Sequence, residues 1–171
     1  MKLDAVVLAA LAFTGVAFAQ GAPNDAQIAH IVVTANQVDI DAGKLAESKA
    51  SDAQVKAFGK QMVTDHTGVN QQAVALAKKL DVTPQDNPTS QSLKTGGAEN
   101  VKKLTGLSGA AFDRAYVDHE IAYHEQVLDA IDKVLVPNAK NEELKALIVK
   151  VRPAFVAHLE HAKMVKGQIK G

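Results

Sequence analysis

The segment LAESKASDAQV, residues 45–55, contains the short turn that decides the fold. Before it, over residues 24–50, apolar residues recur at alternating spacings of three and four, which is the pattern of one face of an α-helix. The same pattern resumes after Ser51 and Asp52 and continues to Leu80. Asp52 is a residue type that caps helix N-termini. A connection this short predicts two long helices packed as antiparallel neighbours.

The remainder of the chain predicts a long connection and two further helices. Residues 82–97 contain two prolines, a Gly-Gly pair and several polar turn residues, which indicates an irregular connection, with one helical turn expected in residues 98–104. Helical periodicity returns over residues 108–135 and again over residues 141–169. Four long amphipathic helices with one long connection predict an all-α four-helix bundle of the ferritin-like plan.

The composition excludes several kinds of site. The chain has no cysteine, so it can form neither a disulfide nor a thiolate metal site. Its 19 basic and 19 acidic residues give a formal net charge of zero, without the basic excess typical of a nucleic-acid binder. We therefore expect no nucleic-acid partner. The sequence does not identify another partner or an oligomeric state.

The first residues, MKLDAVVLAALAFTGVAFAQ, have the pattern of a secretory signal peptide. A lysine is followed by a short apolar run and by the small-x-small triplet that ends at Ala19. The run is too short to cross a bilayer as a stable anchor. We expect residues 1–19 to be a signal peptide, residues 20–171 to form a single domain, and the protein to be periplasmic or secreted.

Three of the six histidines are predicted to face the core. On helical wheels drawn at about 100° per residue, His158 lies about 20°, His66 about 40° and His124 about 50° from the centre of the apolar stripe. His30 lies about 120° from its stripe, so we expect it to be solvated. The remaining two histidines, at positions 119 and 161, lie near stripe edges.

Two acidic residues accompany the inward histidines. Asp39 points inward on the first helix, and Glu120 lies one turn before His124. At about 1.5 Å rise per residue, the inward groups of the four helices share one height to within a turn. The sequence therefore predicts a site for a single transition-metal ion, namely zinc, iron, manganese or copper, with His66, His124, His158 and Asp39 as candidate ligands. Glu120 is either another ligand or an acceptor for an imidazole N–H.

A structural polar network without metal is the alternative for the same residues. Burying an imidazole or a carboxylate without a partner costs several kcal/mol. Tyr116 and Tyr123 could supply hydrogen bonds to inward histidines, and such a network would fix the register of the helices. A bundle that folds equally well with and without a chelator would favour the metal-free interpretation.

Three motifs together resemble those of an exported bacterial family of unknown function, often labelled "predicted outer membrane protein". They are DHT at residues 65–67, SGAAFDRAY at residues 108–116 with His124 after it, and RPAFVAHL at residues 152–159. The resemblance extends over residues 26–166 and implies a ferritin-like helical bundle and export. The helices have charged outer faces, which argues against a membrane span.

The resemblance also points to particular positions. The family's characteristic residues correspond here to Asp65 and His66, the Phe112-Asp113 pair with Tyr116, His124, and Pro153 with His158. The family's acidic pair near a glycine corresponds to Asp39 and Asp41 before Gly43, with aspartate where glutamate is common. The resemblance implies no particular activity.

Two functions from different classes follow from the sequence. Di-iron enzymes of ferritin-like bundles use Glu-x-x-His motifs, and the chain has none, so the sequence predicts no di-iron oxidase. A metal-binding bundle that serves binding, storage or sensing is the first hypothesis. A metal-free cell-envelope interaction or stress protein is the second.

Overall fold

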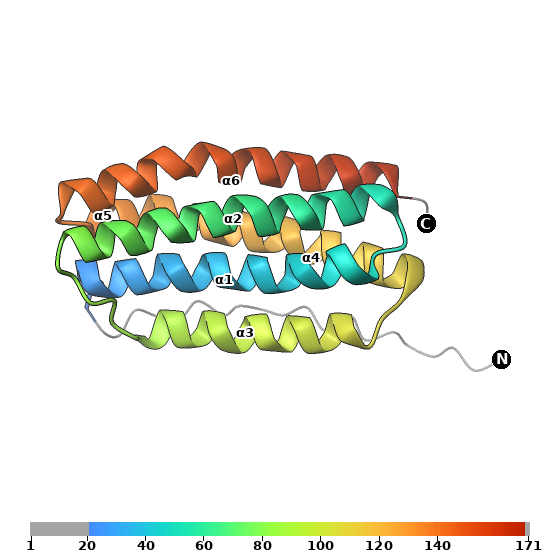
Figure 1. The fold of residues 1–171 in the computed structure, drawn as a ribbon, viewed down its shortest axis with the longest axis horizontal. Coiled ribbons are helices and arrows are strands. Elements are labelled where there is room, and N and C mark those ends of the chain that lie inside the picture. The colour runs from blue at the N-terminus through green and yellow to red at the C-terminus, as the bar shows by residue number, and fades with distance from the viewer. Residues whose placement is uncertain (1–20, 170–171) are drawn as a thin grey trace.

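The computed structural model describes residues 21–169, and its regular elements are helices (Figure 1). In chain order they are α1 (Asp25–Lys49), α2 (Ala53–Lys79), α3 (Pro88–Thr105), α4 (Gly109–Ala130), η1 (Ile131–Leu135), α5 (Val136–Asn138) and α6 (Glu142–Gln168). The expected signal peptide, residues 1–19, lies outside the described residues.

Side-chain caps explain where three of the long helices begin. Asn24 Oδ1 accepts a hydrogen bond from the backbone N–H of Gln27 at 2.9 Å, and Gln27 Oε1 accepts one from the backbone N–H of Asn24 at 3.0 Å. Asp52 caps α2 and Asn141 caps α6, and each side chain accepts hydrogen bonds from two backbone N–H groups of the first turn. Such caps satisfy N–H groups that have no partner within the helix. The predicted starts of these helices are confirmed to within about two residues.

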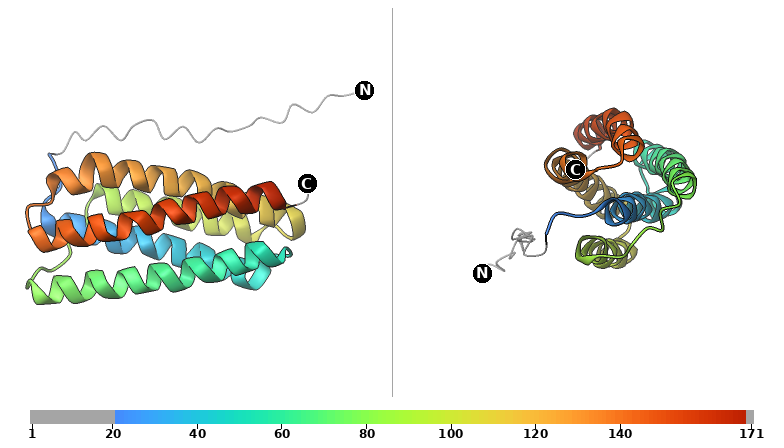
Figure 2. Two further views of the ribbon diagram at one scale, coloured as in Figure 1. Left: turned by 90° about the horizontal axis from the view of Figure 1, so that it is seen from above. Right: turned by 90° about the vertical axis from the view of Figure 1, so that its left-hand side faces the viewer.

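The long helices α1, α2, α4 and α6 surround a common core (Figures 1 and 2). Helices α1 and α6 run in one direction, and α2 and α4 run in the opposite direction. The end-on view in Figure 2 shows α3 outside this group, against α1. Helix α3 carries the chain back along the bundle, which is why α2 and α4 can be parallel although they are nearly consecutive.

The expectation of an irregular connection after α2 is wrong, because α3 is a helix of 18 residues. Asn87 caps it reciprocally with Ser90, and Pro88 occupies its first turn, where a missing N–H does no harm. Gly97 faces α1, and a Cβ at this position would lie 2.8 Å from a methyl group of Val38. The glycine that suggested a loop is therefore a contact point between helices.

The third predicted helix is longer than expected. Helix α4 continues through the π-helical turn η1 into α5, so that the helical run ends at Asn138 instead of residue 135. The prediction that α6 continues through Pro153 is confirmed, and Pro153 is exposed, away from the core. Among the described residues, no helix has the length and apolar character that crossing a membrane requires.

Helices α1 and α2 approach closely at two glycines. A Cβ on Gly59 would lie 2.7 Å from the Cβ of Ala46 and 2.9 Å from the carbonyl oxygen of Gly43. A Cβ on Gly43 would lie 2.8 Å from the Gly59 carbonyl oxygen. This contact fixes the axial position of α2 against α1, and with it the height of the residues that follow on each helix.

The core consists of two apolar clusters. One includes Ile28, Val38, Tyr123 and Phe155, and the other includes Ala42, Met62, Tyr116 and Ala162. Both clusters draw on α1, α4 and α6 but at different heights, and a layer of buried polar side chains lies at the boundary between them. These side chains are Asp39, His66, Glu120, His124 and His158.

Candidate metal centre

His66 lies on α2 and is fully buried. Its Nδ1 is 2.7 Å from Oδ1 of Asn36, a buried residue of α1. The Asn36 amide nitrogen donates to the carbonyl of Val32, so the amide oxygen faces His66 and must accept from Nδ1–H. The proton on Nδ1 leaves a lone pair on Nε2, and Nε2 is buried without a hydrogen-bond partner among the described residues.

His124, on α4, is held in the same tautomer by its own helix. Its Nδ1–H donates to the backbone carbonyl of Glu120, one turn earlier, at 2.9 Å. The side chain is fully buried, and Nε2 has no hydrogen-bond partner within the described chain. This nitrogen also presents a lone pair to the interior.

His158, on α6, is held in the opposite tautomer, with the proton on Nε2. Its Nε2–H donates to Oδ2 of Asp65 on α2 at 2.9 Å, and Asp65 is 41% exposed at the side chain. The inner nitrogen, Nδ1, is buried and unpartnered in the residues described. Each of the three histidines therefore has one nitrogen fixed by an acceptor and the other free.

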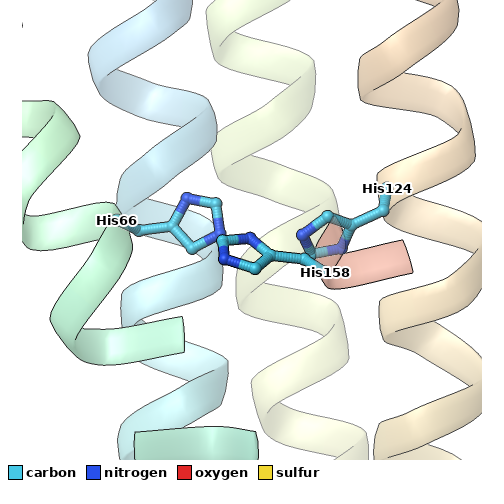
Figure 3. Close-up of side chains that lie close together, drawn as sticks. All are labelled: His66, His124 and His158. Carbon is cyan, nitrogen blue, oxygen red and sulfur yellow. The ribbon is translucent and has the colours of Figure 1, made fainter. Parts of the chain in front are cut away.

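The three histidine rings converge. Figure 3 shows the rings of His66, His124 and His158 extending toward one another from three helices. One nitrogen from each lies within 4.8 Å of the others. Donors around an ion bound at about 2.0–2.1 Å lie at most about 4.2 Å apart, so a small inward shift would complete the ring of ligands.

Two carboxylates adjoin the three histidines. Asp39 of α1 is 1% exposed, and its Oδ2 lies 3.6 Å from His66 Nε2. Glu120 of α4 is fully buried, and oxygens of Asp39 and Glu120 lie within 4.8 Å of a nitrogen of His124. All four carboxylate oxygens are buried without a hydrogen-bond partner in this part of the chain. They form a second set of donors that shares His124 with the first.

Burial shifts the protonation of these groups toward their neutral forms. Desolvation, reinforced by His124 and His158, lowers the pKa of His66 to about 2. Desolvation also lowers the pKa of His124 and of His158, against the opposing effects of Glu120 and Asp65 respectively. Desolvation first, and then the neighbouring Glu120, raise the pKa of Asp39 well above its usual value. The histidines are thus neutral, which is the form in which an imidazole can bind a metal ion.

Tyr116 and Tyr123 are the two tyrosines that could take part in a metal-free hydrogen-bond network with the inward histidines. The Tyr123 hydroxyl donates to the carbonyl of Ala35 at 3.1 Å. The Tyr116 hydroxyl is buried and has no hydrogen-bond partner in residues 21–169. Burial, together with the charges of Glu120 and Asp39, raises the pKa of Tyr116 well above 10.0. Neither tyrosine satisfies an inward histidine nitrogen.

His30 is not solvated as predicted, because α3 and the segment before it cover this part of α1. The His30 side chain is 20% exposed, and its Nδ1 lies 3.6 Å from Asp86 Oδ1. His30 remains outside the set of converging donors. His119 and His161 lie near the edge of the core, as predicted, and both are partly exposed.

Two of the family-like positions have other roles. Asp113 accepts hydrogen bonds from the backbone N–H groups of Ser51 and Asp52, each at 3.0 Å, and so anchors the turn between α1 and α2. Asp41 is exposed and accepts from the Gln37 amide at 2.8 Å. Of the acidic pair on α1, only Asp39 reaches the histidines.

Sequence reasoning did not identify Asn36, and it named Asp65 without finding that this side chain fixes the tautomer of His158. Asn36 and Asp65 are polar residues within one turn of Asp39 and His66 respectively. A helical wheel assigns each residue an angle on its own helix, whereas these hydrogen bonds join α1 to α2 and α2 to α6. A search for polar acceptors on the neighbouring helix, at the same position along the bundle axis as each inward histidine, could have found them.

Comparison with known proteins gives one match. A family profile described as "Domain of unknown function (DUF4142)" matches residues 12–165. No curated protein and no solved structure matches the chain.

Proposed function

The chain belongs to the family described as a domain of unknown function, DUF4142, and from that premise we propose that it is an exported protein that binds a single transition-metal ion inside its helical bundle. The ligands are the inward nitrogens of His66, His124 and His158, together with a carboxylate from Asp39 or Glu120. The proposal concerns metal binding, storage or sensing, and assigns no catalytic reaction.

One observation carries the proposal. Three buried imidazole nitrogens converge without hydrogen-bond partners among the described residues, while the opposite nitrogen of each ring is bonded to a fixed acceptor. Metal-binding histidines characteristically donate their other N–H to a carboxylate, a carbonyl or an amide, which orients the ring and fixes its tautomer. A structural network would instead leave the buried inward nitrogens paired, because an unpaired buried polar atom is destabilising.

Charge balance supports the same proposal. Two carboxylates, Asp39 and Glu120, are almost completely buried, and no lysine or arginine forms an ion pair with either among the described residues. A divalent cation with two ionised carboxylates and neutral imidazoles gives an uncharged centre. Such a centre avoids the large free energy of burying unpaired charge.

The donor types limit the metal. Imidazole nitrogen with carboxylate oxygen suits zinc, iron, manganese and copper(II), and three histidines with one carboxylate form a tetrahedral or five-coordinate site. We further propose a ferritin-like four-helix plan, with α3 as an addition to it. The arrangement of α1, α2, α4 and α6 around one core supports this plan, and residues 1–19 support export.

Elemental analysis tests the proposed function. The protein is expressed from the 171-residue sequence, purified without an affinity tag, and compared with a variant carrying His66→Ala, His124→Ala and His158→Ala. His30→Ala is the matched control, because His30 is also partly covered but lies outside the converging donors. We expect about one equivalent of transition metal in the wild type and in the control, and none in the triple variant.

Two results would contradict the proposal. If the wild type stays metal-free after incubation with zinc, iron, manganese and copper, the inward histidines are structural. Metal content that falls as much in His30→Ala as in the triple variant would contradict the ligand assignment. The first result would leave the metal-free envelope-interaction hypothesis in place of this one, and the second would mean that other side chains hold the metal.

A further inference from the structure

His119 connects the partly exposed surface of α4 with the buried carboxylates. Its side chain is 24% exposed, yet its Nδ1 is buried and has no hydrogen-bond partner among residues 21–169. That nitrogen lies 4.0 Å from Oε1 of Glu120. The ring stacks on Tyr123, with centroids 5.5 Å apart and planes inclined by 14°. The ring is therefore held with one nitrogen directed toward the interior.

From His119 inward, unpaired donors follow one another to the histidines. His119 Nδ1 faces Glu120, the oxygens of Glu120 and Asp39 lie within 4.8 Å, and Asp39 Oδ2 lies 3.6 Å from His66 Nε2. Every atom in this series is buried and lacks a hydrogen-bond partner in the described chain. The series begins at a partly exposed residue and ends among the three inward nitrogens.

Such a series of donors would lower the free-energy barrier for an ion that enters a buried metal site. A divalent ion that leaves water for an apolar interior loses hydration free energy, and an unpaired charge in that environment is strongly disfavoured. Donors spaced a few ångströms apart let the ion exchange one ligand for the next without passing through an uncoordinated state. The barrier to loading is lower for that reason.

The other partly exposed residue in contact with the centre offers no comparable series. Asp65 is bonded to His158 Nε2–H, so the nitrogen that faces Asp65 carries a proton and has no lone pair to offer. His161, near the same seam between α2 and α6, has its Nδ1 2.9 Å from Gln61 Oε1. On that side, the histidine nitrogens that face Asp65 and Gln61 are already paired.

We infer that His119 is a transient metal ligand, which passes a divalent transition-metal ion from solvent to Glu120 and Asp39 on its way to the three histidines. This role rests on the proposed function, because it requires that the centre binds metal. It differs from that of a permanent ligand: a residue that acts only in transit changes the rates of loading and release together and leaves the equilibrium affinity unchanged.

Stopped-flow kinetics with Co²⁺ test the inference, since the visible absorption of Co²⁺ reports its coordination. Association is measured by mixing metal-free protein with Co²⁺, and dissociation by mixing the loaded protein with excess chelator. His119→Phe keeps an aromatic ring against Tyr123 and removes both nitrogens. We expect both rates to fall by about tenfold, the effect of about 1.4 kcal/mol on the barrier, with the Kd unchanged.

Two further variants make the result specific. His119→Asn restores an oxygen donor near the position of Nδ1, and we expect it to recover part of the lost rate. His161→Phe, the matched control on α6, should load at the wild-type rate. Circular dichroism and thermal unfolding of each metal-free variant verify that the fold is retained.

Each contrary result has a distinct meaning. Unchanged rates in His119→Phe, or an equal slowing in His161→Phe, would overturn the transit role and leave the proposed function intact. A weaker Kd with an unchanged association rate would also overturn it, because His119 would then be a ligand of the bound ion. Wild-type protein that binds no Co²⁺, Zn²⁺ or other transition metal would refute the proposed function, and this inference with it.

Discussion

Asn36 and His66 lie on different helices, and the 2.7 Å hydrogen bond between them determines which nitrogen of the histidine faces the centre. Asn36 is 1% exposed, and its amide nitrogen is already committed to the Val32 carbonyl of the same helix. The orientation of the amide is thus set within α1 before α2 packs against it. A residue that contacts no ligand atom thereby selects the nitrogen available for metal.

Replacement of Asn36 should weaken metal binding without changing the ligands. Loss of such an orienting partner typically reduces metal affinity by about 10–100-fold, and we expect a reduction of this size for Asn36→Ala. Asn36→Asp keeps an acceptor for Nδ1–H and should bind more tightly than the alanine variant. Isothermal titration calorimetry with Zn²⁺ measures both, and Asn100→Ala, at another buried asparagine on α3, should bind like the wild type.

Asp65 should affect both the acidity and the affinity of His158. The hydrogen bond and the charge of Asp65 raise the pKa of His158 against the larger effect of burial. Asp65→Asn should therefore lower that pKa further, which NMR titration of the metal-free protein measures. Asp65→Leu removes the acceptor as well and should weaken Zn²⁺ binding by about 10–100-fold. Exposed Asp41 supplies the control, since Asp41→Leu should alter neither quantity.

Asp39 should make the metal-free protein less stable as the pH rises. Burial and Glu120 raise its pKa in the folded state above the value of 3.8 for an unperturbed aspartate. Above pH 3.8 the unfolded chain releases a proton that the folded chain retains, so the contribution of this group to stability declines with increasing pH. Asp39→Asn should then be more stable than the wild type at pH 7, by on the order of 1–3 kcal/mol.

Urea unfolding in the presence of a chelator, at several pH values between 4 and 7, tests this expectation for Asp39. The advantage of Asp39→Asn should shrink as the pH approaches the lower end of that range. The same variant should bind Zn²⁺ more weakly than the wild type, because it lacks a carboxylate. A wild type that is the more stable protein at pH 7 without metal would contradict the assignment of a buried, unpaired carboxyl group.

Two glycines of α2 should respond in opposite directions to the same substitution. Gly59→Ala places a Cβ 2.7 Å from Ala46 Cβ and 2.9 Å from a backbone oxygen of α1, so we expect a loss of about 1–3 kcal/mol. Gly68 has no atom within 4 Å of the added Cβ, and Gly68→Ala should stabilise the helix by about 0.5–1 kcal/mol. Urea midpoints measure both, and a stabilised Gly59→Ala would show that the two helices can separate without loss.

Much of the fold was predictable because the relevant signals are local. Asn24, Asp52 and Asn141 cap helices through contacts with residues two or three positions ahead, and the apolar stripes follow from periodicity alone. The inward direction of His66 and His158 follows from the same periodicity, and both are buried. The family match over residues 12–165 agrees with the predicted membership in a family of unknown function.

The parts that were missed depend on contacts between distant segments. From the sequence, Gly97 was assigned to a loop, because its contact with Val38 of α1 cannot be inferred from neighbouring residues. His30 was predicted to be solvated, because its own helix does not show that Asp86 and α3 cover it. The partners of the histidine nitrogens require the relative rotation of neighbouring helices, which no single-helix wheel contains. Tertiary packing, rather than local propensity, decides these features.

Helix α3 is the long element that contributes no donor to the centre, whereas α1, α2, α4 and α6 each contribute at least one. An ion bound there must be released before any of those four helices detaches, so mass action makes their opening free energy depend on the concentration of free metal. Helix α3 can open from the outside of α1 at a free energy that does not depend on metal. If the centre binds metal as proposed, the chain combines a metal-responsive unit of cooperativity with one that does not respond to metal, and amide hydrogen exchange would distinguish the two along a single polypeptide.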